Sequence, residues 1–251
     1  MISAETNLAW VAASLEKGWE AAYAAFAGYL PPKKLDASPL RRPEQILNDL
    51  QSAPLRELSG NALGDYAMWA ITTVGGVDEY KHYLPRILQH ALLTPGEPGF
   101  DPLLILSRLE YARWHEWTTQ EQSAVKDVLQ ASWNWARLQH PDELDAMNWF
   151  VSVVRLEKDI SSLLEAWLAN MMPNSALQLA DIIRSSDRLP YGGTFWENLD
   201  IESRRTIASW LCSETLQTAV MAVVDGIADG DMWRIDSVEA ALADMRATPW
   251  R

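Results

Sequence analysis

The residues best suited to acid–base chemistry lie together in one short segment. They are Asp78, Glu79, Lys81, His82 and Arg86. Glu79 precedes His82 by three residues and His82 precedes Arg86 by four, so these side chains share one flank of a helix. A histidine between a carboxylate and a cation can transfer protons, and Tyr80, His82 and Arg86 would then bind a small molecule in a pocket between helices. A general base needs a convergent pocket, however, and the sequence shows no second half of one. Surface ion pairing or a buried, hydrogen-bonded histidine is therefore the stronger interpretation.

Other catalytic signatures are missing from the sequence. It contains no GxGxxG or GxxxxGK phosphate loop, no GxSxG nucleophile turn and no HExxH zinc motif. Ser14 and Lys17 match the SxxK pattern, but the companion SDN and KTG elements are absent. Three acids near the C-terminus, Asp225, Asp229 and Asp231, do not follow the order of a calcium loop and are interpreted as a solvated helix end. The sequence therefore predicts no catalytic residues, no metal ion and no cofactor.

One stretch resembles a known kind of protein. A glycine pair, Gly75-Gly76, is followed by the segment YKHYLPRIL at residues 80–88. Downstream, the pattern includes Trp114, Trp117, Glu121 and Trp133. The stretch resembles uncharacterised bacterial helical proteins in which an aromatic, basic, Leu-Pro-Arg segment follows a glycine turn, and the likeness covers roughly residues 60–135. This resemblance implies a bacterial, soluble, helical protein and brings no activity or catalytic residues with it.

Charge indicates the kind of partner the protein would have. The chain holds 21 Lys and Arg against 34 Asp and Glu, a formal net charge of −13 at pH 7. Residues 101–251 hold 13 basic and 23 acidic side chains, so most of the excess lies there. Because such a surface repels phosphate and anionic lipid, the sequence argues against nucleic-acid and membrane partners and favours a basic protein. A solvated surface kept soluble by self-repulsion is the simpler explanation of the same charge.

Tryptophan is unusually frequent, with 13 in the chain. Most must lie in a core, but Trp133 and Trp135 are two residues apart and point roughly 200° apart on a helix. Either this helix is sandwiched between neighbours or one of the two indoles is exposed. Exposed Trp beside carboxylates is typical of binding hot spots. The candidate partner surface comprises Trp114, Trp117, Trp133, Trp135, Asp142, Glu143 and Asp145.

Two functions of different class remain. The first is a cytoplasmic, acidic protein-binding module, either an adaptor or an immunity-type inhibitor that covers a basic toxin domain. The second is a small-molecule sensor or enzyme with a pocket near His82 and Arg86. The first is favoured because catalytic motifs are absent, no basic leader precedes an apolar run in the first thirty residues, and the longest uncharged stretch, residues 166–180, is too short to cross a bilayer. The identity of the partner and the oligomeric state stay open.

Helical periodicity runs through nearly the whole chain. Apolar residues recur every three or four positions, and no stretch alternates convincingly as a strand. Helices are predicted at residues 6–29, from 43, and at 55–73, 77–92, 101–113, 118–138, 141–155, 159–170, 173–185, 200–212, 213–228 and 231–246. The one long irregular loop is expected at residues 186–194. The predicted fold class is all-α, with about ten to twelve helices packed as antiparallel hairpins.

A single helical domain over residues 1–251 is predicted, with a soft boundary in the linker at residues 31–43. Because no consensus recurs at a fixed period, an irregular HEAT/armadillo-like stack and a compact helical bundle both remain open. Pro85 is expected to kink its helix or to begin a new one near Leu84. Cys212 is expected to be a buried small hydrophobe. The apolar stripe of the helix at 213–228 is expected to lie deep in the core; it consists of Leu216, Val220, Val223, Val224 and Ile227.

Overall fold

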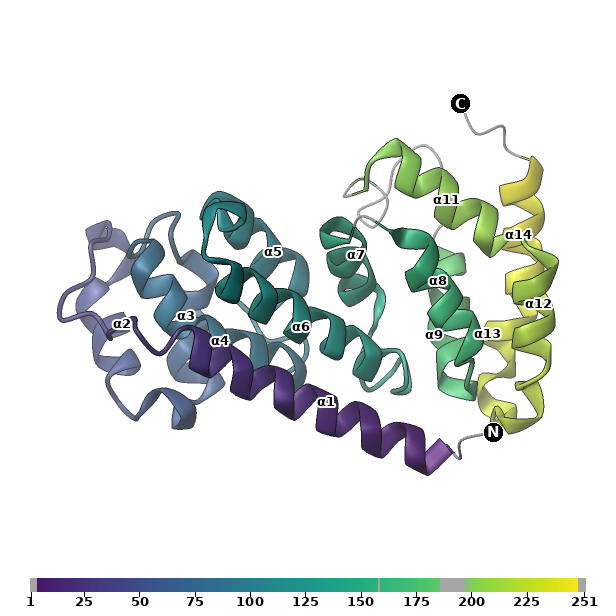
Figure 1. Ribbon diagram of the computed structural model, residues 1–251, viewed down its shortest axis with the longest axis horizontal. Helices are drawn as coiled ribbons and strands as arrows, with labels where there is room; N and C mark the ends of the chain where they lie inside the picture. Colours follow the sequence, from purple (N-terminus) through teal and green to yellow (C-terminus); the bar gives the residue numbers. More distant parts are fainter. Residues whose placement is uncertain (1–3, 158, 186–196, 198, 248–251) are drawn as a thin grey trace. The chain divides into compact units, whose positions relative to one another are not determined.

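The protein is helical throughout the part of the chain that the structure describes. The structure is a computed structural model, and it describes residues 4–157, 159–185, 197 and 199–247 (Figure 1). Within these ranges, extended pairing is limited to isolated bridges from Val74 to Ala37 and to Ala70. The predicted all-α fold is therefore confirmed. The loop expected at residues 186–194 lies outside the described residues.

The chain divides into two compact units. One is Ala9–Ser132, and the other combines Met1–Leu8 with Trp133–Arg251. The divisions fall after Leu8 and after Ser132, each inside a helix, and the soft boundary in the linker at residues 31–43 stays a prediction. We call them the N-terminal and the C-terminal unit and describe each by itself.

Helices α1 to α6 supply the N-terminal unit. They are α1 (Ala4–Ala25), α2 (Pro43–Leu50), α3 (Gly60–Trp69), α4 (Val77–Leu93), α5 (Pro102–Tyr111) and α6 (Thr119–Ala136), with short 3₁₀ turns at Pro39–Arg41, Leu55–Glu57 and Trp114–Glu116. The predicted capping box at the start of α6 is confirmed, because the Glu121 amide donates to Thr118 Oγ1 at 3.3 Å and the Thr118 amide donates to Glu121 Oε2 at 2.9 Å. Gly75, with φ of +64°, turns the chain between α3 and α4, which pack against each other.

One prediction for this unit was wrong, and one of the two alternatives predicted at Pro85 is excluded. The helix predicted at 55–73 is a 3₁₀ turn followed by α3, because the Ser59 hydroxyl accepts a hydrogen bond from the Ala62 amide and starts a new helix there. No new helix begins near Leu84, because α4 runs unbroken through Pro85. Pro85 and Leu84 are both buried, and this packing sustains the helix although proline lacks an amide donor.

Helices α7 to α14 supply the C-terminal unit. They are α7 (Met147–Leu156), α8 (Ile160–Ala169), α9 (Pro173–Ser185), α11 (Ile201–Leu211), α12 (Glu214–Met221), α13 (Met232–Asp236) and α14 (Val238–Ala247), with 3₁₀ turns η4 (Val224–Gly226) and η5 (Asp229–Asp231). Helix α9 is the central one, since it packs against both α13 and α14 and most of its residues are buried. Trp133, Phe150 and Trp167 form an aromatic cluster with ring centroids 4.7 to 5.3 Å apart.

Three helix boundaries of this unit differ from the prediction. The helix predicted from residue 141 begins at Met147, because the buried Gln178 amide holds the preceding loop: its Nε2 donates to Leu144 O at 2.7 Å and its Oε1 accepts from the Ala146 amide at 3.0 Å. The helix predicted at 213–228 ends at Met221. The one predicted at 231–246 is broken at Ser237 into α13 and α14.

Among the described helices, none is by itself both long and apolar enough to span a bilayer. Helix α11 and the stretch Glu214–Gly226, bent by 54° between them, meet the length and composition limits only when taken as a pair.

Candidate functional site

Of the three side chains of the predicted ligand site near His82, Tyr80 is buried and the other two bind separate internal partners. The ring of Tyr80 is buried, and burial raises the pKa of its hydroxyl. His82 Nδ1 lies 2.7 Å from the carbonyl oxygen of Tyr29, to which it donates, and burial lowers the pKa of His82. Arg86 donates through Nε to Leu58 O at 2.8 Å. His82 and Arg86 are therefore bound to backbone carbonyls of two different segments.

Lys81, from the same segment, belongs to a buried polar network. Its Nζ lies 2.9 Å from Glu121 Oε1 and donates to the Tyr29 hydroxyl at 2.8 Å. The Tyr29 hydroxyl donates to Glu121 Oε1 at 2.6 Å, and the ammonium also sits 4.4 Å from the ring centre of Trp117. The network joins the segment after α1 to α4 and α6, so its charges are placed to hold these elements together.

Glu121 and Lys81 stay charged near neutral pH, so neither exchanges a proton readily there. Burial would raise the pKa of Glu121, but hydrogen bonds from Tyr29, Lys81 and Thr118 outweigh it and lower this pKa to about 2. Burial would lower the pKa of Lys81, but its bonds to Tyr29 and Glu121 outweigh that effect, so its pKa is raised. A general acid or base working near neutrality needs a pKa near 7, and neither group has one.

The tryptophans of the predicted partner surface divide into two pairs. Trp117 and Trp133 are buried, and Trp117 Nε1 donates to Ala112 O at 3.1 Å. Trp114 and Trp135 are half-buried. The two buried indoles belong to the core, so Trp114 and Trp135 are the indoles of this set that could touch a partner.

The acids of that predicted surface are largely engaged within the chain. Asp142 forms an ion pair with Arg234, and Asp145 accepts a hydrogen bond from the Met147 amide at 2.8 Å. Glu143 is exposed. Sequence spacing gave no sign of the pair between Asp142 and Arg234, because its members are 92 residues apart.

Arg234 is the centre of a compact ion cluster. It is buried, and it forms ion pairs with Asp142, Asp181 and Asp231. Burial would lower the pKa of Arg234, but the three carboxylates outweigh it and the pKa is raised. His140 Nε2 adds a contact of 3.2 Å to Asp231 Oδ1. Arg234 lies on α13, so the cluster ties this five-residue helix to α9 and to the loop before α7.

Part of this cluster has the composition of a metal site. Ligand atoms of His140, Asp142 and Asp231 lie within 4.8 Å of one another. However, Arg234 already forms ion pairs with both carboxylates, and His140 Nδ1 accepts a hydrogen bond from the Asp142 amide at 3.2 Å. A divalent cation there would lie beside the positive charge of the buried Arg234, so the donor set fits an ion-pair network better than a metal centre.

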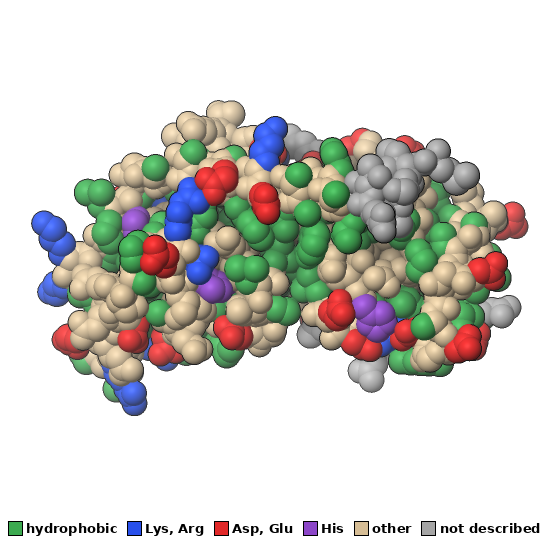
Figure 2. Space-filling view, turned by 90° about the horizontal axis from the view of Figure 1, so that it is seen from below, with side chains coloured by type: hydrophobic (Ala, Val, Ile, Leu, Met, Phe, Trp, Pro, Cys, Tyr) green, Lys and Arg blue, Asp and Glu red, His purple; other side chains and the backbone are tan. Residues whose placement is uncertain are grey.

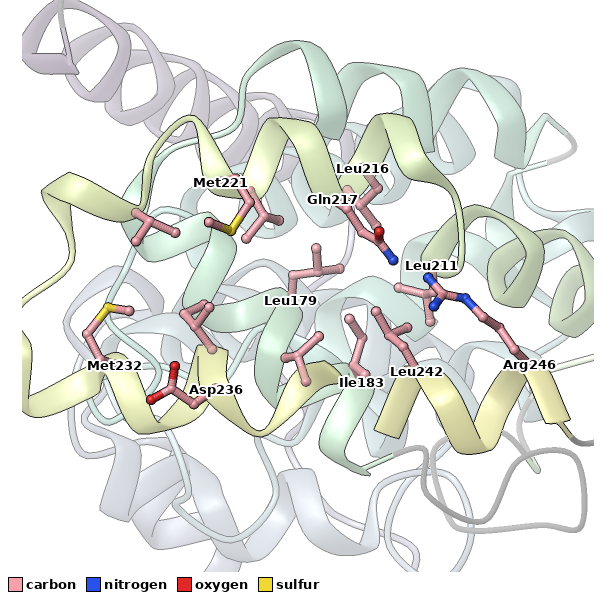
Figure 3. A pocket seen from close by; sticks show the side chains of 14 residues that line it. Leu179, Ile183, Leu211, Leu216, Gln217, Met221, Met232, Asp236, Leu242 and Arg246 are labelled. Carbon is pink, nitrogen blue, oxygen red and sulfur yellow. The ribbon is translucent and has the colours of Figure 1, made fainter. Parts of the chain in front are cut away.

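The other face of α13 forms one wall of an apolar groove. Figure 3 shows α12 along one side and α13 with α14 along the other, with Leu179 and Ile183 of α9 between them. The groove has a volume of about 340 Å³. Its lining residues are Leu179, Ile183, Leu211, Leu216, Gln217, Val220, Met221, Val224, Met232, Ile235, Asp236, Val238, Leu242 and Arg246. We refer to this feature as the C-terminal groove.

The groove overturns the prediction that the stripe at 213–228 lies deep in the core. Leu216 and Ile227 are buried, but Val220 and Val224 are only half-buried and line the groove, and 64% of Met221 is exposed. The apolar spacing was correctly observed, but no helix covers this side of α12 among the described residues. Cys212, expected to be buried, is half-buried.

The walls of the groove are held by a buried apolar cluster, by a helix cap and by ion pairs. Ala176, Leu177 and Ile227 form a buried cluster, and Val220, Val223, Met232 and Ile235 pack against it. Helix α12 is started by Ser213, whose hydroxyl accepts from the Leu216 amide at 3.3 Å. A five-residue helix such as α13 is unstable alone, and the Arg234 ion pairs on its opposite face hold it in place.

The polar groups of the groove lie at its ends. Figure 3 shows Asp236 with Met232 at one end and Arg246 with Gln217 at the other. Burial raises the pKa of the Cys212 thiol next to this second end, and a hydrogen bond with Arg246 opposes the shift. The middle of the groove is apolar, so its lining brings no pair of ionisable groups together and is suited to binding rather than proton transfer.

Comparisons with protein-family models, with curated proteins and with solved structures each found no match to this chain. A function can therefore be inferred only from the residues themselves.

Proposed function

We propose that this protein is a binding module whose C-terminal groove holds an amphipathic helix from a basic partner protein. The observation that carries the proposal is the uncovered apolar side of α12. Val220 and Met221 of α12 and Val224 of η4 line an open groove together with Leu179 of α9 and Leu242 of α14. A helix laid there with its apolar face inward would complete the packing that the neighbours of α12 leave unfinished.

The shape of the groove favours a helix over a small molecule. A pocket for a small ligand encloses most of the ligand's surface. Here the rim residues Met221, Asp236 and Arg246 are exposed, so an occupant would stay open to solvent along one side. The wall from Met232 to Arg246 spans 14 residue steps, about 20 Å at the rise of an α-helix. A partner helix of three to four turns has this length and keeps its polar side in water.

Charge favours a basic partner over a second copy of this chain. The net charge of −13 opposes self-association, because two copies would bring like charges together. Exposed acids lie on the elements that form the groove: Glu214 on α12, Asp225 on η4 and Asp236 on α13. On the face in Figure 2, the part formed by the C-terminal unit shows several acidic side chains and little basic surface. A basic helix would meet opposite charges there, which speeds encounter and penalises acidic competitors.

Such a protein would act as an adaptor, or as an immunity-type inhibitor that neutralises a basic toxin domain by covering it. Both roles need a stoichiometric binding surface and no catalytic centre. They differ only in whether the bound partner loses its activity.

The test is binding of a designed peptide to matched variants. The probe is an 18-residue, fluorescein-labelled peptide with leucines along one helical face and lysines on the other, followed by fluorescence anisotropy at low and high salt. Met221→Lys places a charge in the groove, and Ala222→Lys places the same charge on the next, exposed residue, which does not line it. Burying a methionine contributes about 1.5 to 3 kcal/mol, so Met221→Lys should weaken binding at least about tenfold.

The control variant Ala222→Lys should change the affinity less than about twofold, the effect of one exposed charge. Equal weakening by both variants would mean that the peptide is held by net charge alone and would contradict the proposal. If the wild-type protein instead associates with itself, as measured by light scattering, and this association prevents peptide binding, the groove is an interface between copies of the chain.

A further inference from the structure

The two ends of the C-terminal groove carry opposite charges. Of its fourteen lining residues, Asp236 and Arg246 are the charged ones. Figure 3 shows them at opposite ends. They are ten positions apart in the sequence, about 15 Å at the helical rise of 1.5 Å per residue. A bound helix of three turns is therefore long enough to lie over both.

Both charges are available to a ligand. The side chains of Asp236 and Arg246 are exposed, and neither forms an ion pair with another residue in the described part of the chain. The polar contact of Arg246 is with the thiol of Cys212. Asp236 is the last residue of α13, where the helix dipole disfavours a carboxylate. It also lies two residues before α14 begins at Val238, so the dipoles of the two helices act on it in opposite directions.

We infer that Asp236 and Arg246 set the direction in which a helix lies in the C-terminal groove. The basic end of the helix lies over Asp236 and its acidic end over Arg246. This inference rests on the proposed function and adds to it the charge pattern of the partner: an apolar face flanked by Lys or Arg at one end and by Asp or Glu at the other. Reversing such a helix brings like charges together at both ends.

The size of this preference follows from the exposure of the two residues. An exposed charge pair changes binding by up to about fivefold, because solvent screens it. Two independent pairs therefore favour one direction by up to about 25-fold at low salt, and the preference falls as the ionic strength rises. The apolar contacts along the middle of the groove are the same in both directions and supply the affinity.

The test uses paramagnetic labels on a peptide with a leucine face, lysines at one end and glutamates at the other. A spin label is attached to either end, and the protein carries ¹³C in its methionine methyl groups. Met221 and Met232 lie toward the Asp236 end of the groove (Figure 3). The label on the lysine end should erase the signals of these two methyl groups, and the label on the glutamate end should leave them visible.

The double variant Asp236→Lys/Arg246→Glu keeps the net charge and should reverse the result, so that the label on the glutamate end erases the signals. Both positions are exposed, and a methionine spectrum of the free variant that matches the wild type establishes that it is folded. Equal loss from both labels, or a direction unchanged in the double variant, would overturn this inference while leaving the proposed function intact. Absence of binding by every peptide would instead overturn the proposed function.

Discussion

Replacing Lys81 with methionine should destabilise the N-terminal unit severely. Lys81 is 7% exposed and its partner Glu121 3%, and their charged atoms are 2.9 Å apart. Removing one member of a buried ion pair typically costs about 3 to 5 kcal/mol, because the remaining charge stays buried without compensation. Glu121 keeps its bonds from Tyr29 and Thr118, so the loss should be near the lower figure, about 3 kcal/mol. Methionine has a similar volume, so the change tests the charge rather than the packing.

The assay is native-state amide hydrogen exchange along α4 and α6, which reports the free energy of opening for this unit by itself. Glu121→Gln should also lower this free energy, because it leaves the Lys81 ammonium without its carboxylate. The double variant Lys81→Met/Glu121→Gln should lose less than the two single losses added together. A loss below about 1 kcal/mol for Lys81→Met, the level of an exposed ion pair, would refute the conclusion that this network holds the unit together.

The same pair predicts how the stability depends on pH. The pKa of Glu121 is lowered to about 2 in the folded protein from its ordinary value of 4.5. A lowered carboxyl pKa contributes stability that is present above about pH 4.5 and is lost as the pH falls toward 2, on the order of 3 kcal/mol in all. The difference in the free energy of unfolding between the wild type and Glu121→Gln should shrink as the pH falls from about 4.5 to about 2 and disappear at the lower pH. A difference independent of pH would contradict the assignment of the charge to Glu121.

Three further predictions test other parts of the structure. Trp133→Ala should lower the free energy of unfolding by about 3 to 5 kcal/mol, because it removes a ring from a buried aromatic cluster. Trp135→Ala, at a half-buried position, should lower it clearly less. Equal losses for the two variants in thermal unfolding would contradict the burial described. Gly99→Ala should cost at least about 1 to 3 kcal/mol, because Gly99 has φ of +93° and an added Cβ would lie 2.7 Å from a backbone carbonyl oxygen, and the open position Gly28→Ala is the matched control. Arg234→Met should both speed hydrogen exchange in α13 and weaken peptide binding to the C-terminal groove. If neither the exchange rate nor the affinity changes, the ion cluster does not support the groove wall.

Local sequence rules predicted the helices well where the determinants are short-range. The capping box of Thr118 and Glu121 lies within three residues, and the start of α9 at Pro173 was predicted from the proline and the polar residues after it. The prediction of a helix start at Pro141 was wrong, because the segment before Met147 is held as a loop by Gln178, more than 30 residues later. Short-range rules contain no information about such a partner.

The candidate site was harder to predict, because periodicity shows which side of a helix is apolar but not what covers it. The stripe with Val220 and Val224 was found in the sequence and interpreted as core, whereas the structure leaves it open to the groove. Likewise, Lys81 was identified as part of a constellation, but its partner Glu121 is 40 residues away and could not be inferred from spacing. In the structure, Met221 is 64% exposed, which shows that this helix has an uncovered side.

The most direct test of the C-terminal groove is a methionine methyl NMR titration with the lysine-bearing amphipathic peptide. The eight methionines include Met221 and Met232 in the groove and Met68 in the N-terminal unit. The methyl signals of Met221 and Met232 should shift and saturate with one peptide bound per chain, while the signal of Met68 stays unchanged. Unchanged signals from Met221 and Met232 in the presence of bound peptide would contradict the account, because the helix would then lie elsewhere on the protein.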